Sequence, residues 1–243
     1  MRDSFLLKID TSKDTTQNPN NFTVRYNHFE LDPLEQYEIA LVKSNMWYSW
    51  YNISSAIGNN QVKYYNPVDS VELTITFPDG FYSVADINDR FETVLGSNIK
   101  VVPNFQTFRV QVQLASGWEL RLSNNAGFAS LLGFGAVDIT TTTTATLPAD
   151  ITRGITSILI SCDIVEPNSK ENDLETNLLF SFAPDTAPGS LLTFEPKERL
   201  YLPLRTHTDH IYSMTTTVKD NKGRIVEFNG ENLTHILHIR KKE

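Results

Sequence analysis

The chain has 243 residues, of which 40% are hydrophobic and 21% charged, and its net charge is −8 with a pI of about 5.2. This composition is typical of a folded globular protein and excludes a wholly disordered chain. The acidic balance lacks the basic footprint of a nucleic-acid-binding protein, so we expect no direct binding of DNA or RNA. No stretch approaches the ~20 apolar residues of a membrane span. The first residues also lack the apolar core of a signal peptide.

Alternation of apolar and polar residues predicts short strands along the whole chain. Such strands have one buried and one solvated face, which is the usual habit of antiparallel sheets. In chain order, the expected strands lie at residues 5–10, 21–26, 37–47, 61–65, 71–77, 107–114, 118–122, 155–165, 178–183, 201–204, 211–219, 224–228 and 235–239.

The alternation is strictest in two of these segments. In the first, the apolar residues expected on one buried face are Val71, Leu73, Ile75 and Phe77. In the second, they are Phe108, Val110, Val112 and Leu114. The later segment 155–165 is continuously apolar at its centre, so we expect a central strand that is buried on both faces.

Two short helices interrupt the strands. Ser83 precedes an apolar repeat of helical spacing and Asp86 follows it by three residues, which predicts a capped helix that Gly96 ends. The apolar positions of this helix are Val84, Ile87, Phe91, Val94 and Leu95. A second helix is expected at residues 125–132, ended by Gly133. Both apolar stripes are interpreted as core contacts rather than ligand grooves.

Many short strands with few helices indicate an all-β fold, a single jelly-roll-type antiparallel β-sandwich with two short helices. We expect one jelly-roll domain over residues 1–243. The polar, threonine-rich stretch at 138–150 is interpreted as a loop inside that domain, with an internal boundary as the alternative.

The sequence offers little catalytic chemistry. Cys162 is the only cysteine and lies in the most apolar strand, which indicates an inert buried thiol and no disulfide. His207, Asp209 and His210 are interpreted as a solvated loop rather than a metal site. The acidic stretches 30–35 and 171–175 lack the spacing of a calcium loop. We therefore expect no catalytic residue, cofactor or metal, and no enzymatic activity.

One aromatic cluster supports a functional hypothesis. Trp47, Tyr48, Trp50 and Tyr51 fall within a few residues, and strand alternation would expose some of them. Exposed aromatic residues mark interfaces or sugar-binding platforms. The alternative, which large aromatic side chains favour, is that they fill the end of the sandwich core.

Segments along the chain resemble the penton-like minor capsid proteins of Polinton (Maverick) elements and adintoviruses. The most specific is Phe77-Pro-Asp-Gly-Phe-Tyr-Ser-Val-Ala-Asp-Ile-Asn88, similar to the glycine turn and capped helix of that family. The other matching segments, in chain order, are residues 21–24, 37–42, 49–52, 131–134, 155–165, 178–182, 188–191, 220–226 and 237–240.

The resemblance implies a single jelly roll that forms a homopentamer at the fivefold vertices of an icosahedral capsid. It implies contacts with a separate major capsid protein, a place in the virion, and no catalytic residues. Two other functions stay open from the residues alone. One is a receptor- or carbohydrate-binding sandwich such as a fibre head or lectin, supported by the aromatic cluster. The other is a hydrolase, supported only by the acidic loops.

Overall fold

The computed structural model describes residues 4–27, 29–167, 169–171, 174–205 and 210–242, without the side chains of 168–175. The chain separates into two compact units. Unit 1 contains Met1–Trp50 and Ile155–Glu243, and unit 2 contains Tyr51–Gly154. Unit 2 is thus inserted into the chain of unit 1. The joins flank residues 51–154, and the stretch 138–150 lies inside unit 2. The expectation of a single domain over residues 1–243 stays a prediction.

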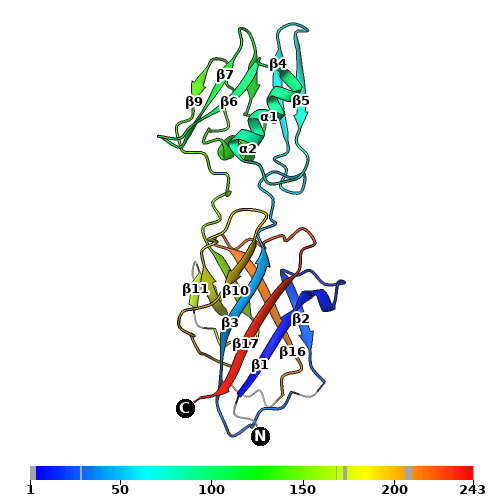
Figure 1. The fold of residues 1–243 in the computed structure, drawn as a ribbon, viewed down its shortest axis with the longest axis vertical. Coiled ribbons are helices and arrows are strands. Elements are labelled where there is room, and N and C mark those ends of the chain that lie inside the picture. Colours follow the sequence, from blue (N-terminus) through cyan, green and yellow to red (C-terminus); the bar gives the residue numbers. More distant parts are fainter. Residues whose placement is uncertain (1–3, 28, 168, 172–173, 206–209, 243) are drawn as a thin grey trace. The chain divides into compact units, whose positions relative to one another are not determined.

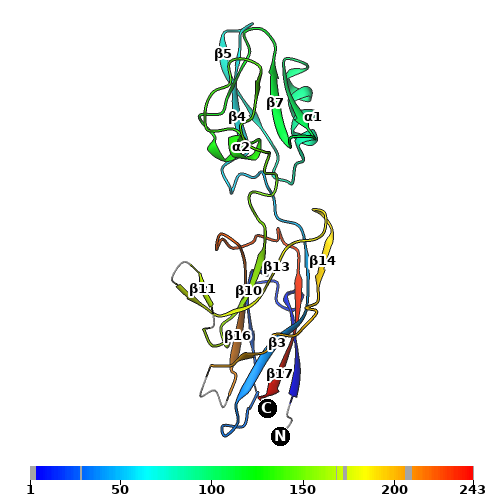
Figure 2. The ribbon, with the colours of Figure 1, turned by 90° about the vertical axis from the view of Figure 1, so that its left-hand side faces the viewer.

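Unit 1 consists mainly of two antiparallel sheets, which face each other as layers in Figure 2. One has the order β1-β17-β3-β14, with β15 also pairing with β3, and the other the order β13-β10-β16-β2. The bounds of the first sheet are β1 Ser4–Asp10, β17 Leu233–Lys241, β3 Tyr37–Trp47, β14 Leu191–Phe194 and β15 Leu202–Pro203. Those of the second are β13 Leu178–Phe182, β10 Ile158–Cys162, β16 Ser213–Asp220 and β2 Asn21–Arg25. A short hairpin, β11 Ser169–Glu171 with β12 Leu174–Thr176, and the 3₁₀ turn η1 Thr11–Lys13 complete this unit.

The strand order identifies the architecture. Numbered along unit 1 without β11, β12 and β15, the strands of the first sheet are the first, eighth, third and sixth, and those of the second are the second, seventh, fourth and fifth. This interleaving of two antiparallel sheets is the jelly-roll topology. The predicted fold class is therefore confirmed, with the jelly roll located in unit 1.

The C-terminal strand β17 lies inside the first sheet, and the N-terminal strand β1 pairs with it as the edge strand. β1 and β3 flank β17 on either side, as Figure 1 shows. The inward side chains of β17 alternate with solvated ones, so Leu237 and Ile239 are fully buried. They share the interior with residues of the facing sheet such as Ile158 and Met214. Burying one such side chain contributes roughly 1.5–3 kcal/mol.

Unit 2 combines two small antiparallel sheets with the two helices. The first sheet has the order β5-β4-β8 and the second β6-β7-β9. The bounds are β4 Gln61–Asn66, β5 Val71–Thr76, α1 Val84–Leu95, β6 Ile99–Asn104, β7 Arg109–Leu114, β8 Glu119–Arg121, α2 Ala126–Leu131 and β9 Thr143–Thr144. Neither of these helices is long and apolar enough to cross a membrane.

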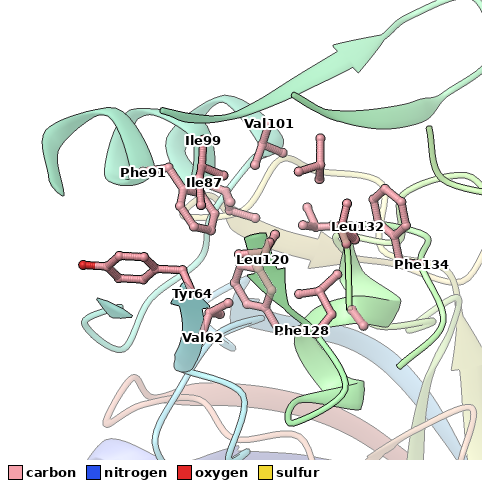
Figure 3. Close-up of a cluster of buried hydrophobic side chains, with 14 of the residues drawn as sticks. Val62, Tyr64, Ile87, Phe91, Ile99, Val101, Leu120, Phe128, Leu132 and Phe134 are labelled. Atoms are coloured by element: carbon pink, nitrogen blue, oxygen red, sulfur yellow. The ribbon is translucent and has the colours of Figure 1, made fainter. Parts of the chain in front are cut away.

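The core of unit 2 is built around aromatic rings. Phe77, Phe91 and Phe128 are fully buried, and their ring centroids lie 5.2–6.4 Å apart. Figure 3 shows side chains of α1, β4, β8 and α2 converging on this cluster, with the hydroxyl of Tyr64 directed away from it. Edge-to-face pairs of this kind add about 0.5–1.5 kcal/mol beyond the buried area.

The predicted helix cap is confirmed in atomic detail. The Ser83 hydroxyl accepts a hydrogen bond from the Asp86 N–H at 3.2 Å, and the Asp86 carboxylate accepts one from the Ser83 N–H at 2.8 Å. Hydrogen bonds that the Ser83 hydroxyl and the Ser83 N–H donate to the Asp86 carboxylate lower the pKa of Asp86. Gly96 follows α1 with a φ of 61°, a conformation that glycine adopts without strain. The second helix is likewise capped, by Asn125.

Two strand predictions in unit 2 were wrong at their first apolar positions. Phe108 lies outside β7, has a φ of 56° and is 72% exposed, because the turn after Asn104 ends there. In β5, Val71 and Leu73 are each 41% exposed, whereas Ile75 and Phe77 are fully buried. The core packs only against the end of β5. The apolar and polar residues therefore also alternate at the start of the strand, where no side chain is buried. Val94 of α1 is also exposed.

Two strand predictions in unit 1 also need correction. β10 is shorter than the expected strand at 155–165, and its burial alternates because only one face meets the opposite sheet. Residues 224–228 form no strand in the described structure, apart from an isolated bridge between Lys219 and Ile225. The reason is the carboxylate of Asp220, which accepts hydrogen bonds from the Arg224 N–H and guanidinium and holds a turn. The strands β6 and β14 were not predicted.

Candidate assembly surface

The aromatic cluster is divided between buried and exposed positions. Tyr48 and Trp50 are 6% and 4% exposed and stack with ring centroids 4.0 Å apart. Phe228 lies edge-on to Trp50 at 6.1 Å. The rings of Tyr48 and Trp50 therefore lie in the core, as the large size of aromatic side chains favours. Tyr51 begins unit 2 and is half-buried.

Trp47 is the exposed member of the cluster. It ends β3 opposite Leu191 of β14, and the two side chains are 40% and 47% exposed. The Tyr48 N–H donates to the Ser190 carbonyl at 2.9 Å and the Gly189 N–H donates to the Tyr48 carbonyl at 2.8 Å, which ties the strand ends together. The result is a firmly held apolar pair at one edge of the jelly roll. An interface role for this pair stays a prediction.

The sheet edge formed by β13 and β14 is closed between the two layers. Phe194 of β14 lies 4.3 Å from Phe182 and 5.0 Å from Phe180 of β13, measured between ring centroids. On the outer side of this edge, Glu195 forms an ion pair with Lys43 at 2.6 Å, and the Glu195 side chain remains 60% exposed. This edge is therefore filled by aromatic rings and carries carboxylate charge outside.

The opposite edge, between β1 and β2, is open. A groove of about 780 Å³ lies there, lined by polar and charged side chains of β1, η1 and β2. Its carboxylates are satisfied within the chain, since Asp10 binds Lys8 at 2.8 Å and Asp14 binds Gln17 at 2.8 Å. The bonds from Lys8 and Ser12 lower the pKa of Asp10 to about 2. Lys13 and Arg25, by contrast, form no ion pair with any residue that the structure describes.

Unit 2 has a smaller, apolar pocket of about 370 Å³ beside the turn that joins β6 to β7. Phe105 and Phe108 line it and are 82% and 72% exposed. Arg109, at its rim, forms no ion pair within the described residues. Sequence reasoning missed this pocket because Phe108 was assigned to a buried face. The feature of the sequence that could have revealed the pocket is the tight turn at Asn104, whose side chain accepts hydrogen bonds from two backbone N–H groups.

The histidines do not assemble a metal site in the described residues. His207 and Asp209 lie outside those residues, and His210 contacts Glu30 at 3.6 Å. His235 and His238 face opposite sides of β17, as alternation predicts. His235 is fully buried and bonds Ser44 at 2.9 Å, and burial lowers its pKa to about 4.

The remaining candidates have structural partners. Glu35 of the first acidic stretch binds Lys241 at 2.6 Å, and Asp32 accepts from the Leu34 N–H at 3.0 Å. The side chains of the second acidic stretch, 171–175, lie outside the described residues. Cys162 is buried, and this burial raises the pKa of its thiol to about 12, so the reactive thiolate is suppressed.

The structure resembles a known capsid protein along its whole length. The crystal structure of the SeMet-labelled mavirus penton protein superposes with a TM-score of 0.51 at 9% identity, covering 99% of each chain. The chain has a penton-like capsid fold. No protein-family model and no curated protein sequence matches it. The likeness is therefore carried by the path of the chain rather than by conserved side chains.

Proposed function

We propose that the chain is a structural capsid protein that forms a homopentamer at the fivefold vertices of an icosahedral virion. The observation that carries this proposal is the penton-like fold, which spans 99% of both chains and includes the inserted unit. The jelly roll adds support, since its two lateral edges differ in chemistry. A closed ring requires such heterologous contacts, in which different patches of each copy meet.

In this proposal the partners are further copies of the chain and a separate major capsid protein, and the work is done by surfaces without a cofactor. The direct test is the mass of the purified protein in solution by light scattering, together with negative-stain imaging. We expect a ring of about five times the 27.5 kDa chain mass. Co-assembly with the major capsid protein of the same genome should place it at vertices. A monomer at every concentration, without affinity for that partner, would refute the proposal.

A second candidate function is receptor or carbohydrate binding, and the pocket of unit 2 favours it. Its volume lies near the lower end of the ~300–1,000 Å³ range of ligand sites. Two exposed phenylalanines at its rim offer stacking surfaces. A glycan array compared between the wild type and the double variant F105S/F108S tests this function. Equal signals from both proteins would dismiss the pocket as the binding site.

A further inference from the structure

The two lateral edges of the jelly roll differ in form. β1 and β2 are the outermost strands of their sheets at one edge, and β14 and β13 at the other. We name the first the groove edge, defined by Lys8, Lys13 and Arg25. We name the second the β14 edge, defined by Trp47, Asp185, Leu191, Glu195 and Glu198. In a cyclic ring, one side of each subunit contacts the opposite side of the next subunit. The two edges of the jelly roll are therefore candidate surfaces for that contact.

The groove edge presents positive charge. Lys8, Lys13 and Arg25 are exposed and line the same groove. The two carboxylates in the groove, Asp10 and Asp14, are already held by short bonds from the chain itself. Three cations against these two carboxylates leave the groove with a net positive charge, and Lys13 and Arg25 form no ion pair within the described residues. The groove therefore attracts carboxylates from outside the chain.

The β14 edge presents the complementary features. Asp185 and Glu198 are exposed, and neither forms an ion pair within the described part of the chain. Glu195 lies between them in sequence, but Lys43 already compensates its carboxylate at 2.6 Å, so Asp185 and Glu198 supply the negative charge of this edge. The exposed pair of Trp47 and Leu191 supplies apolar surface at one end of this edge, where β3 ends and β14 begins. Aromatic rings with a polar rim are the usual anatomy of a protein interface.

The strand register places Lys8 and Glu195 at matching levels. Lys8 pairs with Ile236 of β17, which pairs with Lys43 of β3. Lys43 in turn binds Glu195 at the other end of this row. Lys13 follows the end of β1, and Leu191 begins β14 opposite the end of β3. In a ring whose axis runs along the strands, rotation preserves these levels, so like levels of the two edges meet.

We propose that the groove edge of one copy receives the β14 edge of the next, with Lys13 and Arg25 pairing with carboxylates of the neighbour. This inference rests on the proposed ring and names its contact. The apolar pair of Trp47 and Leu191 is buried in the same contact. Because the two edges differ, the contact is heterologous and closes into a ring rather than a twofold dimer.

Charge reversal tests the pairing. The groove variant K13E/R25E and the β14-edge variant D185K/E198K each bring like charges together, so both should lose the ring. We expect the concentration at which the ring dissociates to rise about tenfold or more. The combined variant K13E/R25E/D185K/E198K restores opposite charges at every contact and should regain the ring. Mass by light scattering at low and high ionic strength measures all three, with far-UV circular dichroism to verify folding.

The matched control is Asp89→Lys, because Asp89 is exposed on α1 of unit 2 and belongs to neither edge of the jelly roll. It should keep the ring. Rings of wild-type mass and stability in both edge variants would overturn the contact while leaving the proposed function intact. Loss of the ring in the combined variant, with folding preserved, would also overturn it. A wild-type protein that never leaves the monomer would remove the proposed function and this contact together.

Discussion

Unit 1 and unit 2 differ in the sequence separation of the strands that pair. In unit 1 the first strand pairs with the last, as Ser4 pairs with Arg240, so its sheet closes only when both ends of the chain are present. In unit 2 every strand pairing lies within Tyr51–Gly154. Contacts that are close in sequence cost less loop-closure entropy and form faster. We therefore expect unit 2 to behave as the more autonomous of the two.

The largest effect that separates the units should come from Phe128→Ala, which empties the aromatic core of unit 2. Removing a fully buried phenylalanine costs roughly 3–5 kcal/mol in the free energy of unfolding. Hydrogen exchange measured at rising temperature should show that the backbone amides of unit 2 lose protection while those of β17 in unit 1 keep it. Phe105→Ala, at an 82% exposed site, is the control and should change little. Equal loss of protection in both units would mean that they unfold as one.

A pH effect should act on unit 1 through His235. Its folded pKa of about 4 lies below the ordinary value of 6.5, because burial disfavours the charged imidazolium. The unfolded chain therefore takes up this proton first as the pH falls. The free energy of unfolding is therefore unaffected by the protonation of His235 above pH 6.5. It falls by about 3 kcal/mol as the pH falls from 6.5 to about 4.

Denaturant unfolding of wild type and His235→Gln across this pH range measures that contribution as a difference between the two proteins. The variant should lose less stability on acidification than the wild type. His238→Gln serves as the comparison, because partial burial and the nearby Arg199 and Arg240 also lower the pKa of the half-buried His238, so its removal should change the pH profile in the same direction but less. Parallel pH profiles for the wild type and His235→Gln would contradict the assignment.

A smaller effect should come from the cap of α1 in unit 2. Ser83→Ala removes the acceptor for the Asp86 N–H and should cost about 1 kcal/mol. Ser97→Ala, just beyond the other end of the helix, is the matched control. If hydrogen exchange in α1 is equally fast in both variants, the cap does not stabilise this helix.

The smallest effect should be a gain. Phe108 holds a φ of 56°, where a bulky side chain is strained, and it buries little area in return. Phe108→Gly should therefore raise the melting temperature of unit 2 slightly, by up to about 1 kcal/mol in stability. Arg109→Gly, inside β7, should lower it instead. A melting temperature lowered by Phe108→Gly would show that the ring makes contacts worth more than the strain.

Local patterns were reliable wherever neighbours in sequence decide the structure. The bounds of the strand at Tyr37–Trp47, the cap at Ser83 and the turn at Gly223 all follow from side-chain spacing and backbone preference. The candidate site was predictable only in outline. The aromatic cluster could be located, but which rings face outward depended on β14, a strand that sequence reasoning did not find.

The all-β class, the two short helices and the cap at Ser83 were determined by the sequence alone, since periodicity and turn residues act over a few positions. The likeness to penton-like proteins rested on the matching segments along the chain. The division into two units, the burial of Trp50 beside the exposed Trp47, and the open groove at β1 and β2 were decided by the tertiary structure. The physical reason is that strand pairing across the whole chain selects which face meets the other sheet and which edge stays open. No local window of residues contains that choice.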